Sequence, residues 1–252
     1  MHVLVNNSCK NGAFRKAKNR VGANQLNKNN MSEFKLNTAF TDEQLKNIYI
    51  AGVNVVVAKP TKGGSPNVAW QVFKPMQSNT LSWTEEYGIY ASTSEIVSGA
   101  KLSQLSNVPV GAIQNKQYTL ESNATITGPA TGGKPHSYAL ENQYAEKPYM
   151  TVGLYQDATV NGTEIIGNAI SAVPVLRAHN AVMTPYTTVY IWLESNTISN
   201  TVVTNVTSQM TAVKFGGGID TISLAYDSST GKFIPNGRNA DASLIEHHEA
   251  IL

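Results

Sequence analysis

The chain has 252 residues, of which 14% are charged and 41% hydrophobic, and its formal net charge is +2. Ordinary soluble domains have about 25% charged residues; here Thr, Ser, Asn and Gln take the place of the missing charge. This composition excludes a coiled coil, which needs charged flanking positions, and argues against a disordered chain. The length suits one large β domain or two small domains, and no apolar run is long enough to predict a transmembrane helix.

The net charge is unevenly distributed along the chain. Residues 1–30 contain six basic residues and no acid, which leaves thirteen basic and seventeen acidic residues in 31–252. We therefore expect a disordered basic tail over 1–30, or a true start at Met31, followed by a slightly acidic body over 31–240. An arm for nucleic acid or anionic lipid is the alternative interpretation of the tail. Because the body is acidic, nucleic acid is not an expected partner.

The tail holds the single cysteine, Cys9, so the body can contain no disulfide and no cysteine metal site. The tail also lacks the apolar segment of a secretory signal peptide. These observations fit a cytoplasmic protein, or one exported by a route without a signal peptide.

One helix is predicted near the start of the body. Thr41 has the side chain of a good N-cap, and Gln44 three residues later completes a capping box. Leu45, Ile48 and Tyr49 give the helix an apolar face, and Gly52 ends it. The helix is short and its polar face is acidic, which favours packing over one end of a sheet; insertion into a membrane is the alternative.

The rest of the body is predicted to consist of short strands separated by Gly, Pro and Asn. This pattern is typical of an antiparallel β-sandwich, here of about ten strands, with the N-terminal helix and a short C-terminal helix over 241–252. A Gly- and Pro-rich loop or linker is expected at 128–137. The expected strands cover residues 53–58, 68–72, 80–92, 118–120, 149–156, 164–170, 173–177, 185–195, 201–207, 211–215 and 219–226.

Two halves of the body resemble each other at an offset of about 100 residues. Val72 to Lys74 matches Val175 to Arg177, and the spacing of aromatic residues after each segment is similar. The match predicts an internal duplication, with pseudo-repeats over 53–130 and 138–233. A chance alignment of two strand-rich segments is the alternative.

No catalytic residue, cofactor site or metal site is predicted. The chain has no nucleophile motif, and Glu85 and Glu86 are neighbours in a predicted strand, so that their side chains would point to opposite faces. No histidine of the body has a partner at metal-ligand spacing. These histidines are His136, His179, His247 and His248.

Aromatic residues are the candidate ligand-binding residues. Along the strongest predicted strand, Val189, Ile191 and Leu193 alternate with the aromatic side chains, so an inward aliphatic face would turn the aromatic row outward. Such rows bind sugar rings or lie at lipid headgroups. The alternative is that both faces of the strand are buried, in a sandwich centre or under a loop. The candidates, including two from the matching strand, are Tyr186, Tyr190, Trp192, Trp83 and Tyr87.

The body resembles fungal and bacterial lectins and small β pore-forming cytolysins in composition, but no motif of either group covers any stretch, so no residue role is transferred. The sequence favours a non-enzymatic binding protein that recognises glycans or membrane surfaces. A toxin-like or defence-like protein would belong to this class. A self-assembling structural β protein, which would form homo-oligomers through its sheet edges, is the alternative. A hydrolase with dispersed catalytic residues is the second alternative.

Overall fold

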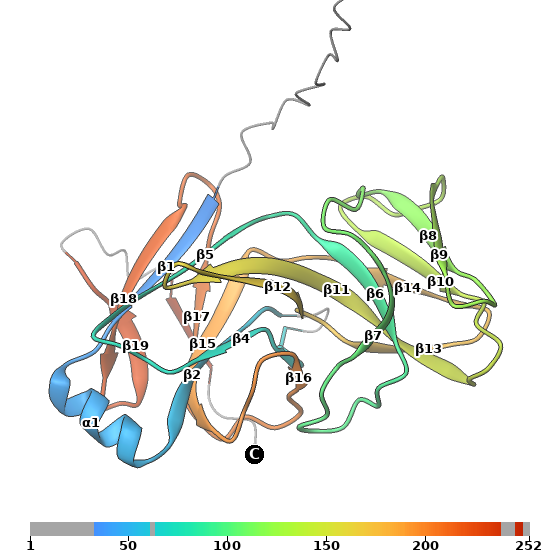
Figure 1. The fold of residues 1–252 in the computed structure, drawn as a ribbon. Helices are drawn as coiled ribbons and strands as arrows, with labels where there is room; N and C mark the ends of the chain where they lie inside the picture. The colour runs from blue at the N-terminus through green and yellow to red at the C-terminus, as the bar shows by residue number, and fades with distance from the viewer. Residues whose placement is uncertain (1–32, 61–63, 238–244, 249–252) are drawn as a thin grey trace, which may run out of the picture. The chain divides into compact units, whose positions relative to one another are not determined.

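The computed structural model describes residues 33–60, 64–237 and, as backbone only, 245–248. Over these residues the protein is mainly β, with one helix, as the sequence predicts (Figure 1). The predicted tail over 1–30 lies outside the described residues, as do most residues of the predicted C-terminal helix. None of the described helical structure is long and apolar enough to cross a membrane.

The largest sheet contains nine of the described strands. These are β19 (Lys232–Pro235), β18 (Thr221–Asp227), β1 (Glu33–Ala39), β5 (Ser78–Thr84), β11 (Tyr149–Val160), β6 (Gly88–Ser92) and β7 (Gln104–Val108), in spatial order, with β12 (Thr163–Ala169) and β13 (Val173–Leu176) on other lengths of β11. Pairing in this sheet is antiparallel except between β1 and β18, which are parallel.

Three smaller sheets complete the described fold. A five-stranded sheet has the order β20 (Ile245–His248), β17 (Met210–Lys214), β15 (Thr188–Ser195), β2 (Val53–Ala58) and β4 (Gln71–Phe73). A four-stranded sheet has the order β14 (His179–Met183), β10 (Tyr138–Asn142), β8 (Lys116–Leu120) and β9 (Ile126–Ala130). A two-stranded ribbon joins β16 (Thr201–Val202) to β3 (Val68–Ala69).

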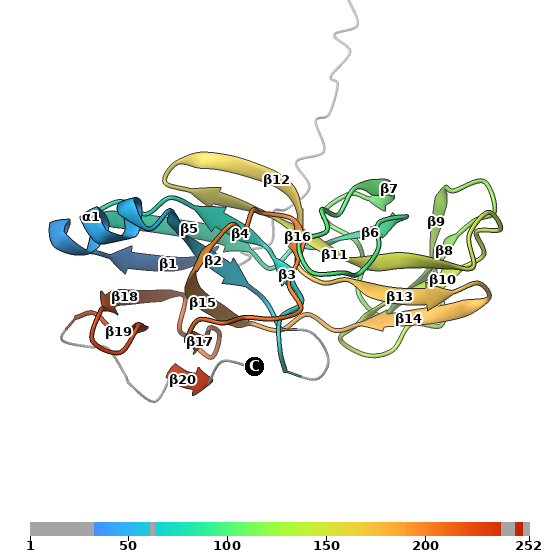
Figure 2. The ribbon, with the colours of Figure 1, turned by 90° about the horizontal axis from the view of Figure 1, so that it is seen from below.

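The sheets pack face to face as a sandwich. One face of the nine-stranded sheet covers the five-stranded sheet at one end and contacts the four-stranded sheet at the other (Figure 2). Rings from opposite layers meet in this core: Phe215 lies 5.2 Å from Phe34 and 5.0 Å from Trp83, centroid to centroid. At the other end, the rings of Tyr87 and Tyr138 lie 5.9 Å apart. The five-stranded and four-stranded sheets thus share one core with the large sheet.

The predicted helix is present as α1 (Asp42–Ile50). Its capping box is complete. The backbone N–H of Gln44 donates to Thr41 Oγ1 at 3.3 Å, and the backbone N–H of Thr41 donates to Gln44 Oε1 at 2.9 Å. Leu45 and Ile48 are buried and pack against the sandwich core, whereas Tyr49, predicted on the same face, is 43% exposed and donates its hydroxyl to the Pro75 carbonyl. The capping and burial confirm the prediction of a helix packed on a sheet.

The structure corrects three details of the predicted elements. The predicted strand over 80–92 is two strands, β5 and β6, because the chain leaves the sheet at residues 85–87. The predicted strand over 201–207 ends at Val202, where β16 stops and the chain crosses the five-stranded sheet. Residues 245–248, which the sequence predicts to be helical, form strand β20, and this strand pairs with the edge of β17.

The proposed duplication matches segments that lie in different sheets. Val72 is in β4, which pairs with β2, whereas Val175 is in β13, which pairs with β11. The pseudo-repeats over 53–130 and 138–233 therefore stay a prediction.

Candidate functional site

Four of the five aromatic candidates are buried. Trp192 is 0% exposed, Tyr190 5%, Trp83 3% and Tyr87 1%, whereas Tyr186 is 38% exposed. The prediction of an outward-facing aromatic row is therefore wrong for Tyr190 and Trp192. The alternative, a strand buried on both faces, is confirmed.

The reason lies in what covers each face of β15. Val189, Ile191 and Leu193 point into the main core, as their alternation predicts. Tyr190 and Trp192, on the opposite face, belong to a second apolar cluster that includes Val206 and Met210. Val206 lies in residues 203–209, which have no regular secondary structure and connect β16 to β17. This stretch, called the 203–209 segment below, covers the aromatic face.

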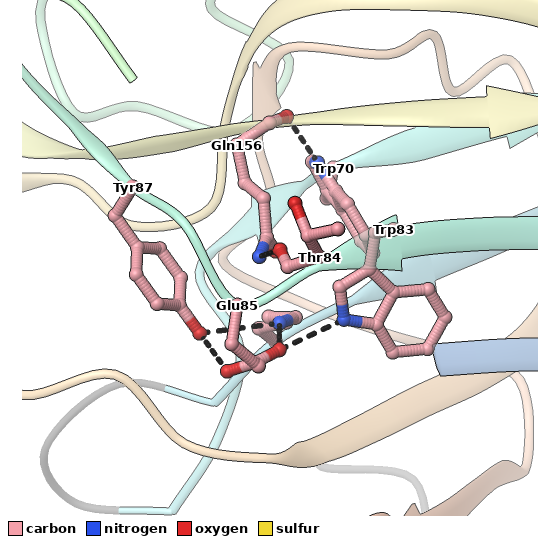
Figure 3. A network of polar contacts seen from close by, with 7 residues as sticks. Trp70, Trp83, Thr84, Glu85, Tyr87 and Gln156 are labelled. Atoms are coloured by element: carbon pink, nitrogen blue, oxygen red, sulfur yellow. Dashed lines mark hydrogen bonds and ion pairs between the residues drawn. The ribbon is translucent and has the colours of Figure 1, made fainter. Parts of the chain in front are cut away.

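Trp83 and Tyr87 belong to a buried polar network around Lys59 (Figure 3). The Lys59 ammonium, on a side chain only 1% exposed, donates to Glu85 Oε1 at 2.9 Å and to the Tyr87 hydroxyl at 3.4 Å. Trp83 Nε1 donates to the same Glu85 oxygen at 2.8 Å, and the Tyr87 hydroxyl donates to the other oxygen. We call these residues, with Trp70, the Lys59 cluster.

Three aromatic rings enclose the Lys59 ammonium. Its nitrogen lies 5.3 Å from the ring centroid of Trp70, 5.2 Å from that of Trp83 and 5.4 Å from that of Tyr87. These are cation–π distances, and such contacts strengthen where water is excluded. The cage is filled by the protein's own lysine.

The surroundings shift the pKa values of all three ionisable groups in this cluster. Burial lowers the pKa of the Lys59 ammonium, against the opposing effect of the Glu85 carboxylate. Burial alone would raise the pKa of Glu85, but the Lys59 charge and the hydrogen bonds from Tyr87, Lys59 and Trp83 lower it overall. Burial, followed by the Glu85 charge, raises the pKa of Tyr87 well above its ordinary value, so Tyr87 stays a donor. Each of the three groups has a hydrogen-bond partner within the cluster.

The Lys59 cluster is best explained as a structural element. A catalytic lysine needs an ammonium or amine that a substrate can reach, whereas the Lys59 side chain is enclosed by rings and a carboxylate. The network joins the end of β2 to the connection between β5 and β6 and so fixes the two layers to each other. We assign it no ligand.

A pocket of about 330 Å³ lies at the far end of β15. It is bounded by the last residues of β15, by β16, by the 203–209 segment and by the turn at 98–99. Its polar lining includes Glu194, Asn196, Asn205, Thr197, Thr201 and Thr207. The lining residues include one carboxylate and no Lys, Arg or His. We call this the Glu194 pocket.

Glu194 carries an unsatisfied acceptor. Its Oε2 is buried and has no hydrogen-bond partner among the described residues, while its Oε1 accepts only a long bond of 3.4 Å from Thr207 Oγ1. Buried polar atoms almost always have a partner, so an orphan acceptor in a pocket calls for an explanation. A donor from a bound molecule would supply the missing partner.

A second, larger pocket lies beside α1 and has a different character. Its volume is about 450 Å³, and its lining includes Gln44, Asn47, Leu193 and Tyr226. Gln44 is engaged in the capping box and donates to the Tyr226 carbonyl at 2.8 Å. None of the unpartnered buried atoms of the described residues belongs to its lining. The Glu194 pocket is therefore the stronger ligand site.

Sequence reasoning missed Glu194, although the sequence carries a signal for it. Glu194 is the only Asp, Glu, Lys or Arg between Arg177 and Lys214, and it ends the strongest predicted strand. An isolated charge in so long an uncharged stretch, followed by a run rich in Ser, Thr and Asn, indicates a special position.

Two of the body's histidines, His136 and His179, have described side chains. His136 and His179 are both exposed, and the hydrogen-bond partner of the His179 ring is the Arg177 carbonyl at 2.9 Å. Within the described residues no group of three His, Cys, Asp or Glu side chains could hold a metal ion. The exposure of His136 and His179 argues against the hydrolase alternative; the side chains of His247 and His248 lie outside the described residues.

Comparison of the chain with models of protein families, with curated proteins and with solved structures finds no match.

Proposed function

We propose that this protein is a non-enzymatic carbohydrate-binding protein and that the Glu194 pocket receives a neutral sugar. One observation carries the proposal: Glu194, whose buried Oε2 has no hydrogen-bond partner among the described residues, lines a pocket whose other polar side chains are hydroxyls and amides. A sugar hydroxyl can donate to the free oxygen, and other sugar hydroxyls can exchange hydrogen bonds with Asn and Thr side chains.

Size and charge support the same class of ligand. A volume of about 330 Å³ is at the lower end of the range for small-molecule pockets, roughly 300–1,000 Å³, which suits one or two sugar rings. The single carboxylate and the absence of a cation from the lining disfavour phosphate-bearing ligands, including anionic lipid headgroups. For this reason the sugar is preferred over the membrane surface.

Binding without hydrolysis is also what the pocket chemistry favours. Glycoside hydrolysis ordinarily needs two carboxyl groups that flank the scissile bond. Glu194 is the one carboxylate in the pocket lining. The pocket can therefore hold and orient a sugar, but its lining lacks the second group that the usual hydrolytic mechanism requires.

The test is a glycan array followed by calorimetric titration of the sugars that bind. Glu194→Gln keeps the shape of the side chain and removes its charge. Because a hydrogen bond to a charged group is worth about 1.5–3 kcal/mol, we expect the affinity to fall by about tenfold or more. Glu146→Gln is the matched control, because Glu146 is exposed and is not among the residues that line the pocket; it should bind as the unmodified protein does. Equal affinity of both variants would overturn the assignment to Glu194.

A further inference from the structure

The cover over the aromatic face of β15 is weakly fastened. Among the described residues, 204–209 make no main-chain hydrogen bond to other main-chain groups. The segment is held at its start, where the Val203 N–H donates to the Asn67 carbonyl at 2.9 Å, and by the 3.4 Å contact of Thr207 with Glu194. Segments with few main-chain hydrogen bonds open at lower free energy than the strands around them.

Val206 is the one buried side chain of this cover, and Val203 also packs against the same cluster. Val206 is 6% exposed and packs in the cluster of Tyr190 and Trp192, whereas Thr204, Asn205 and Thr207 are exposed. Withdrawal of Val206 would therefore uncover part of the aromatic face and leave the sandwich core, on the other side of β15, unchanged.

A second unpartnered polar atom lies beneath the cover. Trp192 is fully buried, and its indole Nε1–H has no acceptor among the described residues. By contrast, Trp70 Nε1 donates to the Gln156 carbonyl at 3.0 Å and Trp83 Nε1 to Glu85 at 2.8 Å. Trp192 and Glu194 are two residues apart in β15, so their side chains emerge on the same face of the strand.

We infer that the 203–209 segment is a movable cover, and that its displacement extends the Glu194 pocket into a cleft in which a sugar ring stacks on Trp192. The inference rests on the proposed function and adds a subsite to it. The unpartnered indole N–H and the unpartnered carboxylate oxygen then form a donor and an acceptor on one face of one strand, next to an aromatic platform. Sugars present hydroxyl groups and an apolar ring face together, which is the chemistry such a cleft recognises.

The first experiment measures hydrogen exchange of the three indole N–H groups by ¹⁵N NMR without any ligand. Trp70 and Trp83 are internal controls, because both are buried and hydrogen-bonded. Trp192→Phe assigns the third signal. We expect the Trp192 indole to exchange at least about tenfold faster than the other two, since it needs only local opening. Exchange of all three at one rate would overturn the movable cover.

A pair of valine variants separates local opening from general destabilisation. Val206→Ala removes two methyl groups from the cover, and Val175→Ala removes the same two from a buried position in β13. Val206→Ala is expected to accelerate Trp192 exchange by about tenfold and to leave Trp70 and Trp83 nearly unchanged. Val175→Ala should leave the ratio among the three rates unaltered. The inference is contradicted if both variants change the ratio of the three exchange rates equally. It is also contradicted if neither variant changes that ratio.

The final arm adds a panel of neutral methyl glycosides (glucoside, galactoside and mannoside). We expect a bound glycoside to shift the Trp192 indole signal and to bind Val206→Ala more tightly, because more molecules are already open. If a glycoside binds and Glu194→Gln weakens it while the Trp192 signal stays fixed, the subsite is overturned and the proposed function stands. If no glycoside binds in this arm or on the array, the subsite fails together with the proposed function.

Discussion

Lys59 is buried like Val55, Val56 and Val57 of β2, and yet it carries an ionisable group. Removing a charge from water is strongly unfavourable unless the charge is paired and hydrogen-bonded. Glu85, Tyr87 and three aromatic rings meet this requirement. The two members of the ion pair differ in exposure, since the Lys59 side chain is 1% exposed and the Glu85 side chain 25%.

This asymmetry gives a prediction about the two single variants. Glu85→Gln leaves an uncompensated charge in the aromatic cage, and we expect the free energy of unfolding to fall by about 3–5 kcal/mol. Lys59→Met removes the deeply buried charge and leaves a carboxylate that reaches solvent, so its loss should be smaller. The double variant should recover most of the loss. Urea unfolding of all four proteins provides the measurement, and equal losses for the two single variants would contradict the account.

The same carboxylate predicts how stability depends on pH. The folded state lowers the pKa of Glu85, so the stabilisation is fully present above the ordinary glutamate pKa of about 4.3 and is lost as the pH falls through the lower folded value. The difference in unfolding free energy between the unmodified protein and Glu85→Gln should therefore shrink below about pH 4. A difference that stays constant from neutral pH down to pH ~3 would refute this role of the ion pair.

The sequence could not predict the Lys59 cluster. Lys59 follows an apolar run and precedes Pro60, which indicates an ordinary strand end, and the pattern over 80–92 predicts one long strand that contains Glu85. The pairing depends on a break at residues 85–87 and on the packing of β2 against β5, both of which are long-range facts. Glu194 is different, because its isolation in an uncharged stretch is visible in the sequence.

At the scale of elements, α1 shows that local chemistry can be predicted from sequence. Thr41, Gln44, Leu45 and Ile48 have the predicted roles, because a capping box and an apolar face depend only on residues within the helix and its first turn. Gln44 also links the helix to the large sheet, because its Nε2 donates a hydrogen bond to the Tyr226 carbonyl in β18.

Thr41→Ala should lower the free energy of unfolding by about 1 kcal/mol, the usual effect of losing an N-cap hydroxyl. Thr93→Ala is the matched control, because Thr93 is exposed; its effect should stay within about 0.5 kcal/mol. Thermal or urea unfolding gives both values. A Thr41 effect no larger than that of Thr93 would mean that the cap contributes nothing to stability.

The sequence predicts the strands less accurately than the helix. Residues 185–195 were recognised because β-branched and aromatic residues are concentrated there, and β15 occupies Thr188–Ser195. Residues 201–207 are also rich in β-branched residues, but after Val202 they cover β15 and do not pair. Strand propensity reflects packing on a half-buried surface, and Val206 obtains that packing without a ladder. The same tertiary effect makes a strand of residues 245–248, where a helix was predicted.

At the scale of the molecule, composition and strand spacing predicted the mainly β sandwich but not its pairing. The parallel contact of β1 with β18 joins Lys35 to Thr221, and no local signal relates the two. The burial of Tyr190 and Trp192 likewise depends on which loop crosses which sheet. Both facts depend on how the layers are assembled. For this reason the sequence predicts exposed side chains for Tyr190 and Trp192, which are buried in the structure.

The edges of the sheets bear on the self-assembling alternative. Prolines lie in three strands with only one described neighbour, as Pro129 in β9, Pro174 in β13 and Pro235 in β19. Proline at an edge opposes strand addition. We therefore predict a monomer in light scattering at all accessible protein concentrations. A mass that rises with concentration would contradict this; the edge strand β7, which exposes Leu105, would then be the first candidate interface.

The central claim is that Glu194 holds a neutral sugar in a pocket of hydroxyl and amide groups. Calorimetric titration of neutral methyl glycosides into the unmodified protein and into Glu194→Gln tests it most directly. The account predicts saturable binding of at least one glycoside by the unmodified protein, weakened by about tenfold or more in Glu194→Gln. Absence of binding to every glycoside, or equal affinity in the two proteins, would contradict it.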